Sequence, residues 1–240
     1  MIKKIEDLKV KIFSDGADKK DMLDMYGKDF IKGLTTNPSL MRKAGVKDYE
    51  AFAKDILSTI KKKPISFEVF SDDFDDMERQ AMKIASWGDN VYAKIPITNT
   101  KKESSKELIK RLANRKVKLN ITAIMTLDQV KTTVLALNDN VPSIISVFAG
   151  RIADTGRDPI PLMKDCLNEM KINPKSELLW ASTRELFSVL QADQIGCHII
   201  TATKDIIKKL PLINYNLEDY SLDTVKSFYK DAKDVNYKIN

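Results

Sequence analysis

The chain has 240 residues, of which 43% are hydrophobic and 31% are charged, a composition typical of a globular protein that can bury one large core. The 40 basic and 34 acidic residues leave a net charge of +6, but the longest basic run is only Lys61-Lys62-Lys63 and no aromatic residues alternate with the basic ones, so we expect no nucleic-acid partner. Residues 1–7 are too charged for a signal peptide and no apolar run approaches the roughly 18 residues of a membrane span, so we expect a cytoplasmic protein with no membrane contact.

Eight short runs rich in β-branched residues recur along the chain, separated by stretches with helical periodicity such as 49–60 and 104–117. The runs are 11–17, 33–37, 65–70, 91–97, 118–124, 143–150, 178–182 and 197–203. This alternation predicts a parallel sheet, and eight units without a Gly-, Ser- or Pro-rich linker favour one closed (β/α)8 TIM barrel as a single domain over residues 1–240. A doubly wound sheet is the alternative, disfavoured because no Gly-x-Gly-x-x-Gly follows the first run.

The tail from Leu217 to Val235 predicts an additional C-terminal helix outside the barrel repeat. Leu222, Val225 and Phe228 lie at helical spacing and form an apolar stripe. Such a stripe needs a partner surface, either the barrel itself or a neighbouring subunit.

Lys94 is the most informative single residue, because it stands inside the apolar run Val91–Ile97. A lysine is seldom buried in a strand unless it is paired or takes part in chemistry, and burial favours its uncharged, nucleophilic form. The alternative is a lysine at a strand end whose amine reaches water.

Other polar side chains stand within or just after the predicted strands. They are Asp15, Asn37, Glu68, Asn120, Thr122, Ser146, Arg151, Ser182 and Arg184. In a barrel, the carboxyl ends of the strands meet on one face, where active sites form, so we expect these side chains to converge there. Separately, each has a structural explanation; Asn37, for example, precedes Pro38 and can simply cap a helix.

Together these groups favour a definite chemistry. A desolvated lysine surrounded by carboxylates and amides can form a Schiff base with a ketone and hold the resulting carbanion as an enamine. Arg151 and Arg184 follow the sixth and seventh strands, where barrels often bind phosphate. The substrate inferred from the residues is a phosphorylated sugar.

At these same positions the sequence resembles the transaldolase family, including the related short fructose-6-phosphate aldolase-like enzymes. The resemblance spans most of the chain and rests on seven ordered motifs. They are Phe13-Ser14-Asp15, Gly33-Leu34-Thr35-Thr36-Asn37-Pro38-Ser39-Leu40, Ser66-Phe67-Glu68-Val69, Lys94-Ile95-Pro96-Ile97-Thr98, Asn120-Ile121-Thr122, Ser146-Val147-Phe148-Ala149-Gly150-Arg151 and Ala181-Ser182-Thr183-Arg184.

The resemblance implies the role of each catalytic residue. Lys94 forms the Schiff base, and Asp15 moves the proton of the C4 hydroxyl during carbon-carbon cleavage and addition. Glu68 and Thr122 position the water that shuttles protons. No metal or organic cofactor is implied, because the iminium itself is the electron sink.

The resemblance also implies the substrate-binding residues, with the asparagines on the dihydroxyacetone fragment, the serines and the phenylalanine around the sugar, and the arginines on the phosphate. They are Asn37, Asn120, Ser146, Phe148, Arg151, Ser182 and Arg184. The family resemblance and the apolar tail together lead us to expect a homo-oligomer.

Two positions discriminate within the resembled family. Glu68 and Phe148 are typical of the transferases, whereas the aldolases that release free dihydroxyacetone carry Gln and Tyr there, so transfer is favoured and release is the alternative. A sugar-phosphate-binding barrel without catalysis is a third hypothesis. Val147, Trp180 and Glu185 depart from the family pattern, and Glu185 can either pair with Arg184 or repel the phosphate. His198 has no role in this chemistry, and we expect it to be structural.

Overall fold

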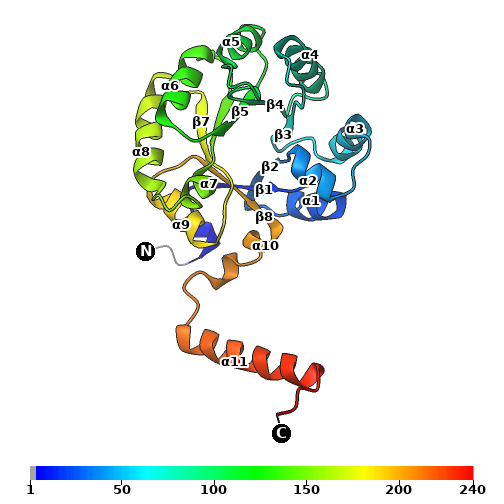
Figure 1. Cartoon of the computed structure of the whole chain (residues 1–240), viewed down its shortest axis with the longest axis vertical. Coiled ribbons are helices and arrows are strands. Elements are labelled where there is room, and N and C mark those ends of the chain that lie inside the picture. The colour runs from blue at the N-terminus through cyan, green and yellow to red at the C-terminus, as the bar shows by residue number, and fades with distance from the viewer. Residues whose placement is uncertain (1–3, 240) are drawn as a thin grey trace.

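The computed structural model describes residues 4–239 and contains a closed barrel of eight parallel strands in sequence order (Figure 1). The N-terminal segment that we expect not to be a signal peptide therefore lies partly outside the described residues. The strands are β1 (Lys11–Asp15), β2 (Ile31–Thr35), β3 (Ile65–Glu68), β4 (Val91–Pro96), β5 (Leu119–Ile124), β6 (Ser143–Val147), β7 (Ser176–Trp180) and β8 (Ile199–Thr203). The predicted (β/α)8 barrel is confirmed.

Helices surround the barrel and follow the strands in turn (Figure 1). The α-helices are α1 (Lys19–Tyr26), α2 (Pro38–Lys43), α3 (Tyr49–Thr59), α4 (Phe74–Ala85), α5 (Lys106–Asn114), α6 (Leu127–Ala136), α7 (Ala149–Ala153), α8 (Ile160–Glu169), α9 (Phe187–Gln194), α10 (Lys204–Ile207) and α11 (Leu217–Asp234). Short 3₁₀ helices are η1 (Ile5–Asp7), η2 (Met170–Ile172) and η3 (Leu210–Leu212). Within residues 4–239, none of the helices is both long and apolar enough to cross a membrane.

Alternate residues of each strand face opposite sides of the barrel wall, and this separates two buried clusters. The larger cluster packs strands against the surrounding helices, whereas the smaller one fills the barrel interior and includes Phe13, Ile144, Leu179 and Ile199. The Phe13 ring lies against Gly33 on the neighbouring strand, where an added Cβ would come within 2.4 Å of a ring carbon. Glycine at position 33 therefore leaves room for the Phe13 ring in the barrel interior.

Six of the eight strands end one to three residues before the predicted run does, and two of these ends bear on the site. β2 begins at Ile31 and ends at Thr35, so Thr36 and Asn37 belong to the connection, and Asn37 caps α2 by accepting a hydrogen bond from the Leu40 amide at 3.0 Å. β6 ends at Val147, and the residues from Ala149 onward turn directly into α7. The β-branched Thr36 and the apolar residues after Val147 extend the two runs past the strand ends, which is why periodicity alone did not mark the boundaries.

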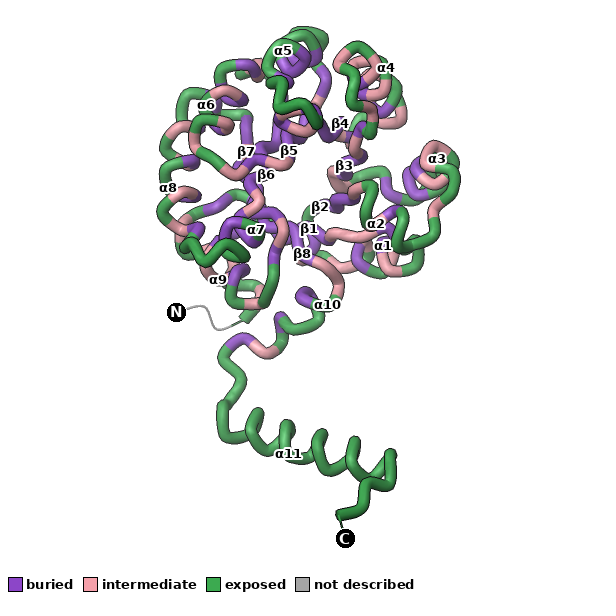
Figure 2. The backbone as a smooth tube through the Cα atoms, viewed as in Figure 1, coloured by how far each residue is buried: buried purple, intermediate pink, exposed green. Residues whose placement is uncertain are grey.

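The additional C-terminal helix is confirmed as α11, and it extends away from the barrel (Figures 1 and 2). Every residue of α11 is exposed, including its apolar stripe, in which Val225, Phe228 and Tyr229 are 60%, 69% and 70% exposed. The chain's own barrel is therefore not the surface that covers this stripe.

Candidate active site

A cavity of about 480 Å³ opens at the carboxyl ends of the strands. All the catalytic and substrate-binding residues predicted from the sequence line it. They are Asp15, Asn37, Glu68, Lys94, Asn120, Thr122, Ser146, Phe148, Arg151, Ser182 and Arg184. The period of two along each strand explains this convergence for the residues within strands, because positions two residues apart share the interior face, and the other residues follow strand ends that meet at the same mouth.

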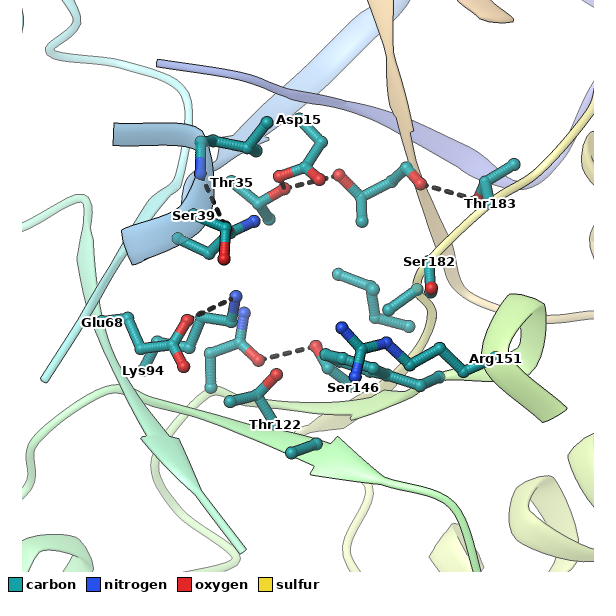
Figure 3. A pocket seen from close by; sticks show the side chains of 18 of the residues that line it. Asp15, Thr35, Ser39, Glu68, Lys94, Thr122, Ser146, Arg151, Ser182 and Thr183 are labelled. Carbon is teal, nitrogen blue, oxygen red and sulfur yellow. Dashed lines mark hydrogen bonds and ion pairs between the residues drawn. The ribbon is translucent and has the colours of Figure 1, made fainter. Parts of the chain in front are cut away.

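Lys94 points into the cavity from β4, and its side chain is 8% exposed (Figure 3). Its Nζ lies 3.0 Å from Oε2 of Glu68, the residue paired with it on β3, and donates a hydrogen bond to the Thr36 carbonyl at 3.2 Å. The buried amine is thus both paired and hydrogen-bonded, which meets the two conditions for burying a charge. A carboxylate in direct contact can also exchange a proton with the amine or with a water beside it.

Asp15 lies on another side of the same cavity, at the end of β1 (Figure 3). Its Oδ1 accepts a hydrogen bond from Thr35 Oγ1 at 2.8 Å, and Thr35 Oγ1 lies 2.6 Å from Thr201 Oγ1. Burial raises the pKa of the Asp15 carboxyl above its ordinary value, although the charge of Lys94 and the Thr35 hydrogen bond oppose the shift. A carboxyl whose pKa moves towards neutrality is suited to taking and returning a proton.

The fifth strand contributes an amide and a hydroxyl with different surroundings. Asn120 donates to Ser66 Oγ on β3 at 3.0 Å and accepts from Ser146 Oγ on β6 at 2.7 Å, so side chains from two other strands fix its orientation. Thr122 Oγ1 is buried and has no hydrogen-bond partner among residues 4–239, which leaves it available to a ligand in the cavity. The next residue, Ala123, has a φ of 61°, and the pairing of β5 with β6 shifts register there. A bulge of this kind commonly re-aims a side chain at a functional site.

The two arginines differ in their partners. Arg151, on α7, lies across the cavity from Lys94 and Glu68 (Figure 3), with its guanidinium 5.4 Å from the centre of the Phe148 ring. Arg184, after β7, forms a bidentate ion pair with Asp154, in which Nε lies 3.0 Å from Oδ1. Among the described residues, Arg184 pairs with Asp154 and not with Glu185, the partner considered from the sequence.

A close backbone contact holds the β6 and β7 ends together. Ser182 has a φ of 64°, and its carbonyl oxygen lies where a Cβ on Gly150 would be, only 1.7 Å from the added atom. Glycine at position 150 therefore allows the first turn of α7 to pack on the segment that carries Ser182 and Arg184.

Three residues of the site were not anticipated from the sequence. Thr35 and Thr201 are the hydroxyl neighbours of Asp15, and Asp154 is the partner of Arg184. Thr35 stands inside a quoted motif, but a threonine in a β-rich run carries no signal of its own. Asp154 is the C-cap of α7 and follows Arg151 by three residues, a spacing that favours pairing with Arg151 and not with Arg184.

His198 lies outside this cavity. Its Nδ1 accepts a hydrogen bond from the Leu178 amide at 2.9 Å, and burial lowers its pKa. These contacts are those of a residue that joins β7 to β8, as expected from the sequence. Cys166 and Cys197 are both buried and unpaired with one another.

A polar cavity at the carboxyl end of a closed eight-stranded barrel, with a paired buried lysine at its base, is typical of the class of (β/α)8-barrel enzymes. Comparison with known proteins narrows this class. A family model described as "Transaldolase/Fructose-6-phosphate aldolase" matches residues 12–239, and the chain belongs to this family.

Relatives from several organisms cover nearly the whole chain. A protein of Nitrosopumilus maritimus is 31% identical over 90% of this chain and 96% of its own length, and one of Clostridium acetobutylicum is 31% identical over 92% and 100%. A third, from a Sulfurihydrogenibium species, is 33% identical over 89% and 96%. All three bear the name "Probable transaldolase".

Proposed function

We propose that this protein is a transaldolase that moves a dihydroxyacetone unit between phosphorylated sugars through a Schiff base on Lys94. The observation that carries the proposal is the contact between the buried Lys94 amine and Glu68, in a cavity that Asp15 also lines. The donor is sedoheptulose 7-phosphate or fructose 6-phosphate, and the acceptor is glyceraldehyde 3-phosphate or erythrose 4-phosphate. The name of the relatives supports transfer as the reaction.

The first half of the reaction forms the covalent intermediate. Glu68 takes a proton from the Lys94 ammonium, the freed amine adds to the C2 carbonyl of the ketose, and loss of water from the carbinolamine leaves an iminium. Glu68 transfers the protons of this step, assisted by a water bound at the Thr122 hydroxyl. The position of Glu68 supports this role, since its carboxylate touches the amine.

The second half breaks and remakes the carbon-carbon bond. Asp15 takes the proton of the C4 hydroxyl, the C3–C4 bond breaks, and the aldose leaves while its former bonding electrons remain as the enamine on Lys94. Addition to the acceptor aldehyde reverses these steps, with Asp15 returning the proton to the new C4 oxygen. Hydrolysis of the new iminium then frees the product and the amine.

Binding residues surround these atoms. Asn37 and Asn120 hydrogen-bond the dihydroxyacetone hydroxyls, and Ser146 and Ser182 line the sugar. The Asn37 Oδ1 already caps α2, so its amide N–H groups are the ones offered to substrate. Arg151 and Arg184 take the phosphate together, since two guanidiniums suit its charge and geometry.

Borohydride reduction tests the covalent step. In the presence of fructose 6-phosphate it should fix a three-carbon adduct on Lys94, located by peptide mass spectrometry. Lys94→Met should form none, whereas Lys63→Met, which removes another half-buried lysine far from the cavity, should label as the parent does. Absence of an adduct in the parent protein would end the proposal.

Release of free dihydroxyacetone is the alternative reaction, and Glu68 with Phe148 favours transfer over it. Measuring free dihydroxyacetone with and without an aldehyde acceptor separates the two reactions. A barrel that only binds sugar phosphates would retain binding in Lys94→Ala and show no turnover in the parent.

We place this reaction in the pentose phosphate pathway and in the cytoplasm as part of the same proposal. The pathway follows from the donor and acceptor sugars. The two free cysteines are consistent with a reducing compartment.

A further inference from the structure

The strand that should flank Glu68 on one side ends before reaching it. β2 pairs with β3 at Leu34–Ile65 and Thr35–Ser66, and the chain then turns into α2. In a parallel sheet the N–H and C=O of one residue point to the same neighbouring strand, and those of the next residue point to the other. The Ser66 carbonyl accepts from the Thr36 amide, and the Val69 amide donates to the Lys94 carbonyl, so the backbone groups of Glu68 point to the side that β2 has left.

The Tyr49 side chain occupies the vacated position. Its hydroxyl donates to the Glu68 carbonyl at 2.9 Å and accepts from the Glu68 amide at 2.8 Å. A single phenol thus satisfies both backbone groups that a strand would otherwise have paired, and an unpaired buried amide or carbonyl is costly. Burial raises the pKa of Tyr49, so the hydroxyl keeps the proton that it donates.

Aromatic packing holds this phenol in place. Tyr49 begins α3, and its ring lies 6.3 Å from the Phe67 ring and 5.4 Å from the Phe70 ring, both edge-on, and 6.3 Å from the Trp87 ring. Phe67 precedes Glu68 in the chain and Phe70 follows it by two residues. Tyr49 therefore contacts the Glu68 backbone through its hydroxyl and the residues before and after Glu68 through its ring. The end of β3 is therefore fixed from α3.

The early end of β2 also provides a hydrogen-bond acceptor for the Lys94 amine. The Thr36 carbonyl, which no longer continues the sheet, accepts the hydrogen bond from Lys94 Nζ at 3.2 Å. Glu68 and Lys94 are register partners, so a shift of the Glu68 backbone changes the 3.0 Å contact between carboxylate and amine directly.

We infer that Tyr49 is a positioning residue for the reaction, which sets the Glu68 carboxylate against the Lys94 amine through two hydrogen bonds to the Glu68 backbone. This inference rests on the proposed function, because it assigns Tyr49 to the proton transfer by Glu68. Tyr49 is not among the residues that line the cavity, so it would act on the reaction through Glu68.

Tyr49→Phe is the direct test, because it keeps the ring and removes only the hydroxyl. We expect kcat for transfer to fall by roughly ten- to a hundredfold, the range that a small misplacement of a reacting group produces, with KM changed by about twofold or less. Tyr26→Phe is the matched control: Tyr26 is a half-buried tyrosine on α1, away from the cavity, and its loss of a hydroxyl should leave both constants unchanged. Rates are expressed per site that borohydride can trap, so misfolded protein does not enter the comparison.

The same substitution made in the Glu68→Gln variant distinguishes a positioning role of Tyr49 from a general structural role. In Glu68→Gln the proton-transfer group is already lost, so adding Tyr49→Phe should lower kcat little further if Tyr49 acts through the carboxylate. The inference is wrong if adding Tyr49→Phe to Glu68→Gln lowers kcat by the same factor as it does in the parent protein. It is also wrong if Tyr49→Phe changes kcat no more than Tyr26→Phe does. An adduct on Lys94 with normal kcat in Tyr49→Phe overturns this inference alone, whereas no adduct in the parent overturns the proposed function.

Discussion

Arg184 is bound to Asp154 by a bidentate ion pair across the β7 and α7 ends, even though Glu185 is its neighbour in sequence. The Arg184 guanidinium lowers the pKa of Asp154, and the carboxylate in turn raises the pKa of Arg184. Arg184 also lines the proposed sugar-phosphate cavity. A phosphate that binds Arg184 must therefore compete with Asp154 or share the guanidinium with it.

Asp154→Asn removes this competition. We expect KM for a phosphorylated ketose to fall by up to about fivefold, since a solvent-exposed ion pair is only weakly stabilising. Steady-state kinetics with fructose 6-phosphate measures the effect, and unphosphorylated fructose, which offers no phosphate, should show none. The exposed carboxylate variant Asp205→Asn on α10 is the control. An equal change in KM for both sugars would show that Asp154 does not act through the phosphate site.

The raised pKa of Asp15 predicts the acid limb of the pH profile. As the proposed base, Asp15 would act only when ionised, so the rate of cleavage should fall as pH decreases through its folded-state pKa, which lies above the ordinary value of 3.8. The rate of enamine formation from fructose 6-phosphate, measured against pH in single-turnover experiments, gives this limb. Asp15→Asn should lower the rate and abolish the limb; an unchanged limb would assign it to another group.

The same shift has a consequence for stability. Between pH 3.8 and its folded-state pKa the native protein holds the Asp15 proton more tightly than the unfolded chain does, so this contribution to stability falls as pH rises through that window. At neutral pH the buried carboxyl therefore contributes less to the stability of the fold than it does below pH 3.8. Asp15→Asn should raise Tm at pH 7 while it lowers activity, and the gain in Tm should shrink as pH approaches 3.8. A lower Tm at pH 7 would contradict this account.

The sequence predicted the barrel and the cavity residues because both depend on short-range rules. A strand period of two places Asp15, Glu68 and Lys94 on the interior face, and a closed barrel brings strand ends together whatever the side-chain detail. The partner of Arg184 and the hydroxyl chain at Asp15 could not be predicted, because they join different loops and strands through particular side-chain conformations. The left-handed backbone at Ala123 was equally hidden, since alanine gives no signal for positive φ.

Gly150→Ala tests the contact between α7 and the β7 end. The new Cβ would lie 1.7 Å from the Ser182 carbonyl oxygen, so the segment carrying Ser182 and Arg184 must move. We expect a loss of about 1–3 kcal/mol in the free energy of unfolding and a higher KM for the phosphorylated donor. Gly27→Ala is the control, because position 27 has a φ of −68° and an added Cβ meets only ordinary contacts at 3.5 Å. Denaturant unfolding with equal losses in the two variants would show that the close contact is relaxed easily.

The exposed stripe of α11 leads us to predict a homo-oligomer in which a second copy covers this helix. An isolated amphipathic helix of 18 residues gains little stability from its own hydrogen bonds and depends on burying its apolar face. The barrel carries separate exposed apolar side chains at Phe70, Leu135 and Phe187, so one chain offers both the helix and surfaces of the kind that it needs. Phe228→Asp should therefore lower the mass measured by light scattering after size exclusion, whereas Asp231→Asn on the same helix should not. A parent protein that stays monomeric at every concentration would contradict the prediction.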